Sequence, residues 1–258
     1  MSSTISARHA ATVTAAAPTV LTDDEAAARP ASGIGAGARL AGKWPIAGFV
    51  AGVSAFFFTI FGSKFYEASV TDKGVDGVYD YVKDTGTGQH VAMDLAFLAA
   101  LALGLFAAGF VRFIASRTPA GSNAASLARL GMGGAVTLTV LIAAFKAIYR
   151  GGLPDHMDHQ MYTKDAVAVL DVLVGQLQFV ALWPLTLVMG AVVALAFRHR
   201  TLPRWYGAVT GVILVATLAM AFVLGLPYFA GLVGPIWIII STIVVLRHRN
   251  RPVGVAVV

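Results

Sequence analysis

The sequence contains no cysteine among its 258 residues. This excludes disulfide bridges, thiolate metal sites, iron–sulfur clusters and cysteine nucleophiles. Charged residues are also scarce, at 12% against about 25% in soluble domains, and no Asp or Glu occurs in residues 95–154 or 172–258. A chain so poor in charge and 57% hydrophobic is typical of integral membrane proteins. Its net charge of +6 therefore reflects membrane topology, and we expect no nucleic-acid partner.

Several functional signatures are missing as well. The chain has no GxxxxGK[ST] phosphate-binding loop, no GxSxG nucleophile motif and no TVGYG filter. No histidine lies in the middle of an apolar stretch, which disfavours a haem held between membrane helices. Catalytic residues therefore cannot be assigned from motifs, and an enzymatic role is not favoured.

Six stretches of about 20 apolar residues are present, the length that crosses a bilayer core of about 30 Å. We predict an all-α integral membrane bundle of six transmembrane helices. Residues 1–40, rich in Ala, Ser, Thr and Gly, are expected to form a disordered tail, and 251–258 a short C-terminal tail. The domain of residues 41–250 would contain spans at about 44–65, 91–115, 127–149, 168–197, 205–225 and 228–246.

Two spans and one loop have further local features. The fourth span is longer than a bilayer requires, which predicts tilt or emergence from it. Pro235 is expected either to kink the sixth span or to lie in its first turn. In the polar loop 66–91, apolar residues recur at helical spacing, which predicts a short surface helix; they are Val75, Val78, Tyr79 and Val82.

Basic residues cluster beside alternate ends of the spans. By the positive-inside rule these ends are cytoplasmic, so both termini are predicted to lie on the inner side of a cell membrane. The outer face would then be the polar face of mixed charge, and the lipid bilayer the one certain partner. The basic residues on which this orientation rests are Arg39, Lys43, Arg112, Arg117, Arg129, Arg198, Arg200, Arg204, Arg247, Arg249 and Arg251.

One outer loop concentrates imidazole and carboxylate groups, the ligand types that suit Zn, Cu, Mn or Fe. It contains Asp155, His156, Asp158 and His159, and the pair His90 and Asp94 is predicted to lie on the same side of the membrane. These six residues are candidate ligands of a transition metal at the outer face. The alternative is a solvated polar connector, because the spacing matches no known metal motif.

A second candidate site involves charges at the outer ends of spans. Lys146 and Arg150 are four residues apart and share a helix face. They could form an ion-pair clasp, or a polar outer pocket for an anion, with Asp94 or Asp171. The alternatives are that the two cations extend to the lipid headgroups and that Asp94 is favoured by a helix N-terminus.

Polar and small residues inside the spans predict helix contacts. Gln176 and Gln178 in the fourth span are expected to hydrogen-bond a neighbouring helix, the alternative being that they line a pathway. Small residues four apart would allow close helix packing; these pairs are Gly48 and Gly52, Gly104 and Ala108, and Gly207 and Gly211.

The last third of the chain has a distinctive order. Leu202-Pro203-Arg204-Trp205 opens a span, a short Gly/Pro hairpin follows, and the final span ends in an arginine cluster. With His90 at the start of a span after a polar loop, residues 44–250 resemble bacterial six-helix membrane proteins of the domain-of-unknown-function 4386 type. The resemblance implies architecture and no activity, and the tail and the 155–159 segment depart from that family.

Three function classes remain open from the sequence. The first is a non-enzymatic membrane component or accessory subunit with a polar outer-face site, whose protein partner or homo-oligomer is unspecified. The second is a small permease or channel, although the inner halves of the spans offer few ionisable groups for proton coupling. The third is an outer-face metal-binding protein or metal-dependent enzyme.

Overall fold

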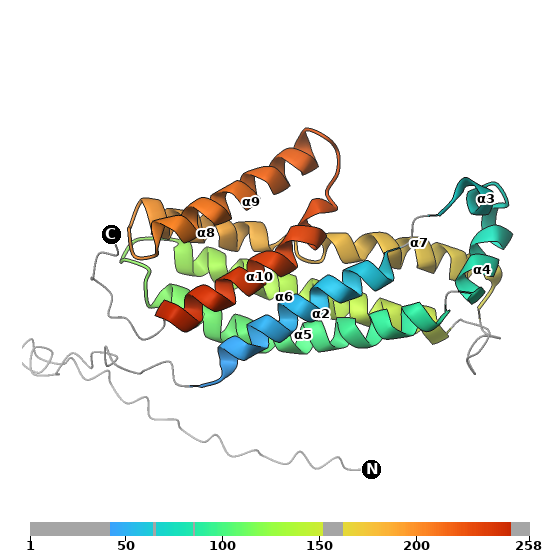
Figure 1. Ribbon diagram of the computed structural model, residues 1–258, viewed down its shortest axis with the longest axis horizontal. Helices are drawn as coiled ribbons and strands as arrows, with labels where there is room; N and C mark the ends of the chain where they lie inside the picture. The colour runs from blue at the N-terminus through green and yellow to red at the C-terminus, as the bar shows by residue number, and fades with distance from the viewer. Residues whose placement is uncertain (1–41, 64–65, 85, 152–161, 249–258) are drawn as a thin grey trace, which may run out of the picture. The chain divides into compact units, whose positions relative to one another are not determined.

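A computed structural model describes residues 42–63, 66–84, 86–151 and 162–248, all within one compact unit, Arg39–Val258. The predicted tail 1–40 and the histidine-containing segment 155–159 lie outside the described residues. In the described part all regular secondary structure is helical (Figure 1). The elements are α2 (Trp44–Gly62), α3 (Ala68–Thr71), α4 (Gly74–Asp84), α5 (Gly86–Ala115), α6 (Ala124–Gly151), α7 (Lys164–Val180), α8 (Leu185–Phe197), α9 (Arg204–Phe222) and α10 (Phe229–His248).

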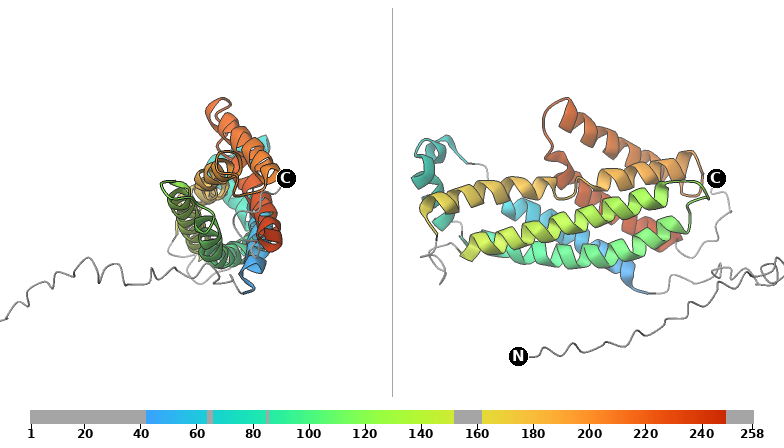
Figure 2. Two further views of the ribbon diagram at one scale, coloured as in Figure 1. Left: turned by 90° about the vertical axis from the view of Figure 1, so that its left-hand side faces the viewer. Right: turned by 180° about the vertical axis from the view of Figure 1, so that it is seen from behind.

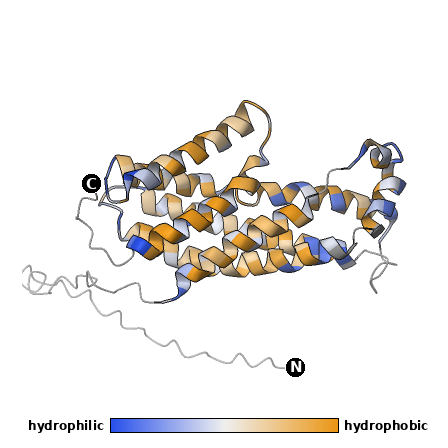
Figure 3. Cartoon of the chain, in the orientation of Figure 1, coloured by the Kyte–Doolittle hydropathy of each residue, from blue (hydrophilic) through white to orange (hydrophobic). Residues whose placement is uncertain are grey.

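Six segments are long and apolar enough to cross a membrane, and hydrophobic residues cover most of their length (Figure 3). Large apolar side chains point outward from them, such as Leu101 (71% exposed) and Val212 (71% exposed). The protein is therefore a polytopic membrane protein, and the predicted six-helix architecture is confirmed. The segments are Trp44–Gly62, Gly88–Ala115, Ala124–Gly151, Lys164–Phe197, Arg204–Phe222 and Phe229–His248.

Successive membrane-spanning segments run in opposite directions, so the connections between them lie at two ends of the bundle. These two ends differ in their residues. At one end, Arg117 after α5 donates a hydrogen bond of 2.6 Å from Nη2 to the carbonyl of His248, the last residue of α10. We call this the basic end; it also contains the α5–α6 and α8–α9 connections. The opposite end carries α3 and α4 (Figure 1), and we call it the capped end.

Glycines set how closely α2 approaches its neighbours. A Cβ at Gly48 would overlap Thr242 of α10 and the Phe106 ring of α5, and one at Gly52 would lie 2.8 Å from the carbonyl oxygen of Pro235. The predicted close packing at this pair is therefore observed. Gly207 is packed as closely, because a Cβ there would overlap the Cβ of Ala196 in α8. A Cβ at Gly104 would meet only Val136, at 3.9 Å, and one at Gly211 only Val193, at 3.7 Å.

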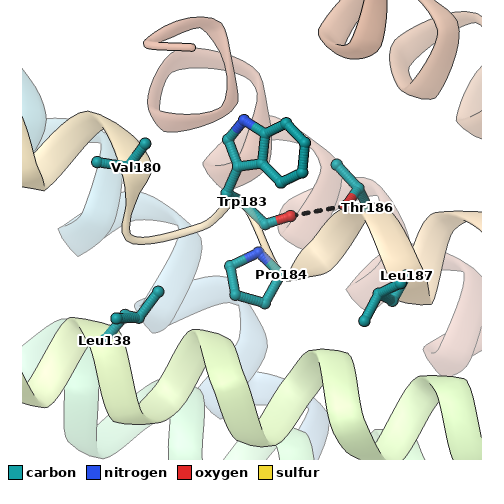
Figure 4. A pocket seen from close by; sticks show the side chains of 6 residues that line it. All are labelled: Leu138, Val180, Trp183, Pro184, Thr186 and Leu187. Atoms are coloured by element: carbon teal, nitrogen blue, oxygen red, sulfur yellow. Dashed lines mark hydrogen bonds between the residues drawn. The ribbon is translucent and has the colours of Figure 1, made fainter. Parts of the chain in front are cut away.

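The fourth span is two helices with a break at residues 181–184. Pro184 has no N–H and its ring conflicts with the carbonyl four residues earlier, which interrupts a helix. At the break, backbone N–H groups donate to the carbonyl three residues earlier and not four, as in an α-helix. Examples are Trp183 N to Val180 O at 3.0 Å and Thr186 N to Trp183 O at 3.0 Å. Figure 4 shows Pro184 at this break on the side of Leu138 of α6, with the Trp183 ring directed away from α6; these residues line an apolar pocket of about 470 Å³.

Helix α9 lies on the outside of the bundle (Figure 2). Only 22% of its most apolar stretch is buried, against 39% to 56% in the other spans. Its first half is attached to α10 by two buried hydrogen bonds, Tyr206 to Ser241 (2.7 Å) and Trp237 Nε1 to Thr210 Oγ1 (3.1 Å). Pro235 lies in the second turn of α10, and that helix continues through it.

The short helix predicted in the first polar loop is α4. Its residue Val82 is completely buried and packs with Tyr149 of α6 and with Val167 and Val174 of α7. Val78 and Tyr79 lie against the same cluster, whereas Val75 is 41% exposed. The apolar face of α4 therefore covers the ends of α6 and α7.

Candidate functional site

A polar cluster is buried inside the bundle near its capped end, where α2, α6 and α7 meet. Lys146 of α6 and Gln178 of α7 are each only 1% exposed. Both side chains reach the same point of α2: a Cβ at Gly62 would overlap Gln178 Oε1 and lie 2.7 Å from Lys146 Nζ. The ammonium of Lys146 and the carboxamide of Gln178 thus lie close together beside Gly62, whose lack of a side chain leaves room for them.

The cluster lies far from the basic end. Gly62 is the last residue of α2, which begins at Trp44, so it lies about 27 Å along that helix at a rise of about 1.5 Å per residue. Lys146 is likewise in the last two turns of α6. The polar groups therefore lie near the boundary of the hydrocarbon layer that the spans would cross, and they face the protein interior.

Asp171 belongs to the same buried region, two turns before Gln178 on α7. It is 3% exposed and accepts a hydrogen bond from the hydroxyl of Tyr66, which follows α2. The Tyr66 ring in turn contacts Tyr81 of α4, with the ring centroids 5.5 Å apart. Through this chain of contacts, the buried carboxylate of α7 is linked to the helix that covers the capped end.

Gln178 is the least satisfied polar group of the cluster. Neither its Nε2 nor its Oε1 has a hydrogen-bond partner among the described residues. Leaving a buried amide unpaired costs about 1–3 kcal/mol, and buried polar groups in proteins are otherwise nearly always paired. Gln178 therefore lacks, among the described residues, the partner that a purely structural amide normally has.

Aromatic and apolar groups surround the cluster. The Phe58 ring of α2 lies with its centroid 6.0 Å from Lys146 Nζ, a distance at which an aromatic face attracts a cation. Tyr149, one turn from Lys146, is 1% exposed, and Arg150 is half-buried. These surroundings exclude water and strengthen the electrostatic influence of the ammonium on whatever lies beside it.

The residues predicted to form a charged clasp are separated into two environments. Lys146 and Asp171 are buried, so Lys146 does not extend to the headgroups, whereas Asp94 is 62% exposed and pairs with His90 of its own helix. Asp94 is also the ninth residue of α5, beyond the first turn where the helix dipole acts. The buried cluster therefore contains Lys146 and Asp171 but not the Asp94 side chain.

The predicted metal ligands are only partly within the described chain. His90 Nε2 and Asp94 Oδ2 lie 3.7 Å apart on an exposed face of α5. In the described residues no group of three or more His, Asp or Glu side chains converges on a common point. Because 155–159 lies outside that part, metal binding by Asp155, His156, Asp158 and His159 stays a prediction.

Sequence reasoning missed three features of the site. Neither Gly62 nor Tyr66 was expected to belong to a site, and Pro184 was not used to divide the fourth span. Pro184 carried a readable signal, because a proline inside an apolar helix predicts a break. The two glutamines were expected to bond neighbouring helices, yet Gln176 is exposed and Gln178 has no hydrogen-bond partner in the described chain.

Comparisons with models of protein families, with curated proteins and with solved structures give no match. The resemblance to six-helix proteins of the domain-of-unknown-function 4386 type therefore stays a prediction.

Proposed function

We propose that this polytopic membrane protein is a non-enzymatic membrane component that binds a small organic anion in the buried cluster of Lys146, Gln178 and Gly62. The observation that carries the proposal is the carboxamide of Gln178, buried beside an ammonium with neither polar atom hydrogen-bonded to a described residue. Structural roles for buried amides require partners, so a role in ligand binding accounts better for this one.

The chemistry of the cluster defines the solute class. Lys146 and Gln178 Nε2 are hydrogen-bond donors, which suit a carboxylate. Gln178 Oε1 is an acceptor, which suits an O–H or N–H group on the same solute. A small carboxylate bearing a hydroxyl or amino group, such as lactate or glycine, matches this set of donors and acceptor.

In this proposal the capped end, and hence this site, lies at the outer face of a bacterial cell membrane, the orientation that the positive-inside pattern favours. In that orientation α4 covers the ends of α6 and α7 on the outside, and solutes reach the cluster from the external medium. Detergent-solubilised and membrane-embedded protein would therefore bind the same solutes. In sealed vesicles, the solute would reach the site from one side of the membrane.

Equilibrium binding to purified protein tests the proposal. Radiolabelled lactate, pyruvate, glycine and acetate are measured against wild type, Gln178→Leu and Gln176→Leu. Gln176 is the matched control, since it is the same residue type on the same helix but is exposed. We expect saturable binding of at least one solute, weakened about tenfold or more in Gln178→Leu, because a hydrogen bond to a charged group contributes about 1.5–3 kcal/mol. The Gln176→Leu protein should bind as wild type does.

Two outcomes would contradict the proposal. If none of the four carboxylates binds saturably, the protein does not bind this class of solute. If Gln178→Leu and Gln176→Leu lose affinity equally, the carboxylate binds outside the cluster.

A second candidate function, a small permease, is favoured by the break in the fourth span. The break begins three residues after Gln178, and transporters build binding sites beside discontinuous membrane helices. Uptake of the bound carboxylate into protein-containing liposomes distinguishes the two functions. A permease gives time-dependent accumulation that exceeds the binding stoichiometry, whereas a binding component gives a plateau equal to the number of sites.

A further inference from the structure

A cavity of about 390 Å³ lies at the basic end, between the α5–α6 connection and the last turns of α8. Its lining combines polar residues of the connection with the end of α8, including Ser122, Asn123, Leu127, Ala194, Arg198 and His199. This cavity is remote from the Lys146–Gln178 cluster, and neither the solute-binding proposal nor any sequence motif accounts for it.

The charge around the cavity is of one sign. The sequence has no Asp or Glu in residues 95–154 or 172–258, so no acidic side chain of α6, α8, α9 or α10 can neutralise Arg198. Arg198 is exposed, and the nearby connection to α9 adds Arg200 and Arg204. An anion at this position would therefore gain the attraction of several cations without competition from a carboxylate of these helices.

The lining of the cavity also has an apolar side. Ala191, Ala194 and Leu127 contribute to it, and Leu127 is 37% exposed on the outer surface of α6. Trp205, in the first turn of α9, is 48% exposed; exposed tryptophans at helix ends mark the membrane–water interface. A cavity with apolar residues next to polar and cationic ones, at the end of the bundle that carries this tryptophan, fits the depth of lipid headgroups.

From this combination we infer that the cavity is a binding site for the phosphate diester of an anionic phospholipid. Arg198 would bind the phosphate oxygens, for which its planar guanidinium is suited, with Ser122 and Asn123 as hydrogen-bonding partners. The apolar side would contact the glycerol and the first methylenes of the acyl chains. The volume is within the range of small-ligand pockets, about 300–1,000 Å³.

The inference is tested by native mass spectrometry of the purified protein with added phosphatidylglycerol, phosphatidylcholine or inorganic phosphate. Wild type is expected to retain one phosphatidylglycerol much more strongly than phosphatidylcholine. Arg198→Gln should reduce the phosphatidylglycerol affinity about tenfold, the loss of one strong charge-assisted contact. Ala194→Leu, which fills the apolar side without changing charge, should reduce it as well.

Arg247→Gln is the matched control, because Arg247 is exposed at the same end but does not line the cavity. It should change the affinity less than about twofold, since exposed charges beyond about 8 Å are screened at physiological salt. Equal losses in Arg198→Gln and Arg247→Gln would overturn the inference in favour of general surface attraction. Displacement of the lipid by millimolar inorganic phosphate would overturn it in favour of a soluble phosphate ligand.

Discussion

The hydroxyl of Tyr66 donates a hydrogen bond to the buried carboxylate of Asp171, and so connects the chain after α2 to α7. Hydrogen bonds to charged groups contribute about 1.5–3 kcal/mol. Tyr66→Phe keeps the ring contact with Tyr81 but removes the donor, so we expect a loss of unfolding free energy of that size. Hydrogen exchange should rise in α4, which packs beside this contact.

The control for this prediction is Tyr228→Phe. Tyr228 is 39% exposed and its ring contacts Phe179 with centroids 5.7 Å apart, a contact that the substitution preserves. It should leave both stability and exchange in α4 unchanged. Unaltered exchange in Tyr66→Phe would show that α4 is held by its apolar face alone.

A second prediction concerns the contact between α7 and α10. A Cβ at Gly231 would lie 2.6 Å from Phe179 Cα and 2.8 Å from its carbonyl oxygen. Backbone atoms cannot rotate away as a side chain can, so Gly231→Ala should destabilise the protein by about 1–3 kcal/mol. At Gly133, in the middle of α6, a Cβ would meet nothing within 4 Å. Gly133→Ala should therefore be neutral or stabilising by up to about 1 kcal/mol. Equal unfolding temperatures in the two variants would contradict this packing.

Arg117 provides a third prediction, at the end of α10. Its Cζ lies 3.9 Å from the centroid of the Phe113 ring, and it donates to the carbonyl of His248. Burial lowers its pKa to about 10, so it stays protonated below pH 9. In the unfolded chain the pKa of Arg117 returns to its higher ordinary value, so the unfolded chain binds more protons than the folded chain above pH 10. Stability should therefore rise with pH there through this group.

Because it loses the hydrogen bond to His248 and the contact with the Phe113 ring, Arg117→Gln should destabilise the protein by about 1–3 kcal/mol between pH 6 and 8, with no pH dependence from this residue in that window. Arg112→Gln is the control, because Arg112 is exposed and donates only to Ala108 of its own helix. Thermal unfolding of both variants at pH 6 and pH 8 checks the prediction. A pH-dependent loss in Arg117→Gln would be inconsistent with it.

The turn after α8 gives a fourth prediction. Arg200 has a φ of 55°, the left-handed region that glycine adopts without cost, and Thr201 N bonds back to Leu195 O at 2.9 Å. Such a turn normally has glycine at this position. Arg200→Gly should raise the unfolding free energy by about 1 kcal/mol, whereas Arg200→Ala, which keeps a Cβ, should not. Equal effects of the two substitutions would mean that the charge and not the backbone is responsible.

The six spans could be predicted because the length and hydrophobicity of a membrane helix are local properties of the sequence. The grouping of Lys146 and Asp171 was also predictable from their positions near span ends. Their burial was not, because a lysine near a helix end fits equally well with extension to the headgroups. The meeting of Gly62 with Gln178 depends on tertiary packing between α2 and α7, which no local pattern contains.

The most direct test of the solute-binding account is thermal unfolding of wild-type and Gln178→Leu protein, with and without the carboxylate that binds most tightly. Removing an unsatisfied buried amide should raise the unfolding temperature of Gln178→Leu in the absence of solute, since about 1–3 kcal/mol of desolvation cost disappears. The same concentration of solute should then raise the unfolding temperature of wild type more than that of the variant. A variant that unfolds at a lower temperature than wild type, with no solute-induced shift in either protein, would identify Gln178 as a structural residue and contradict the account.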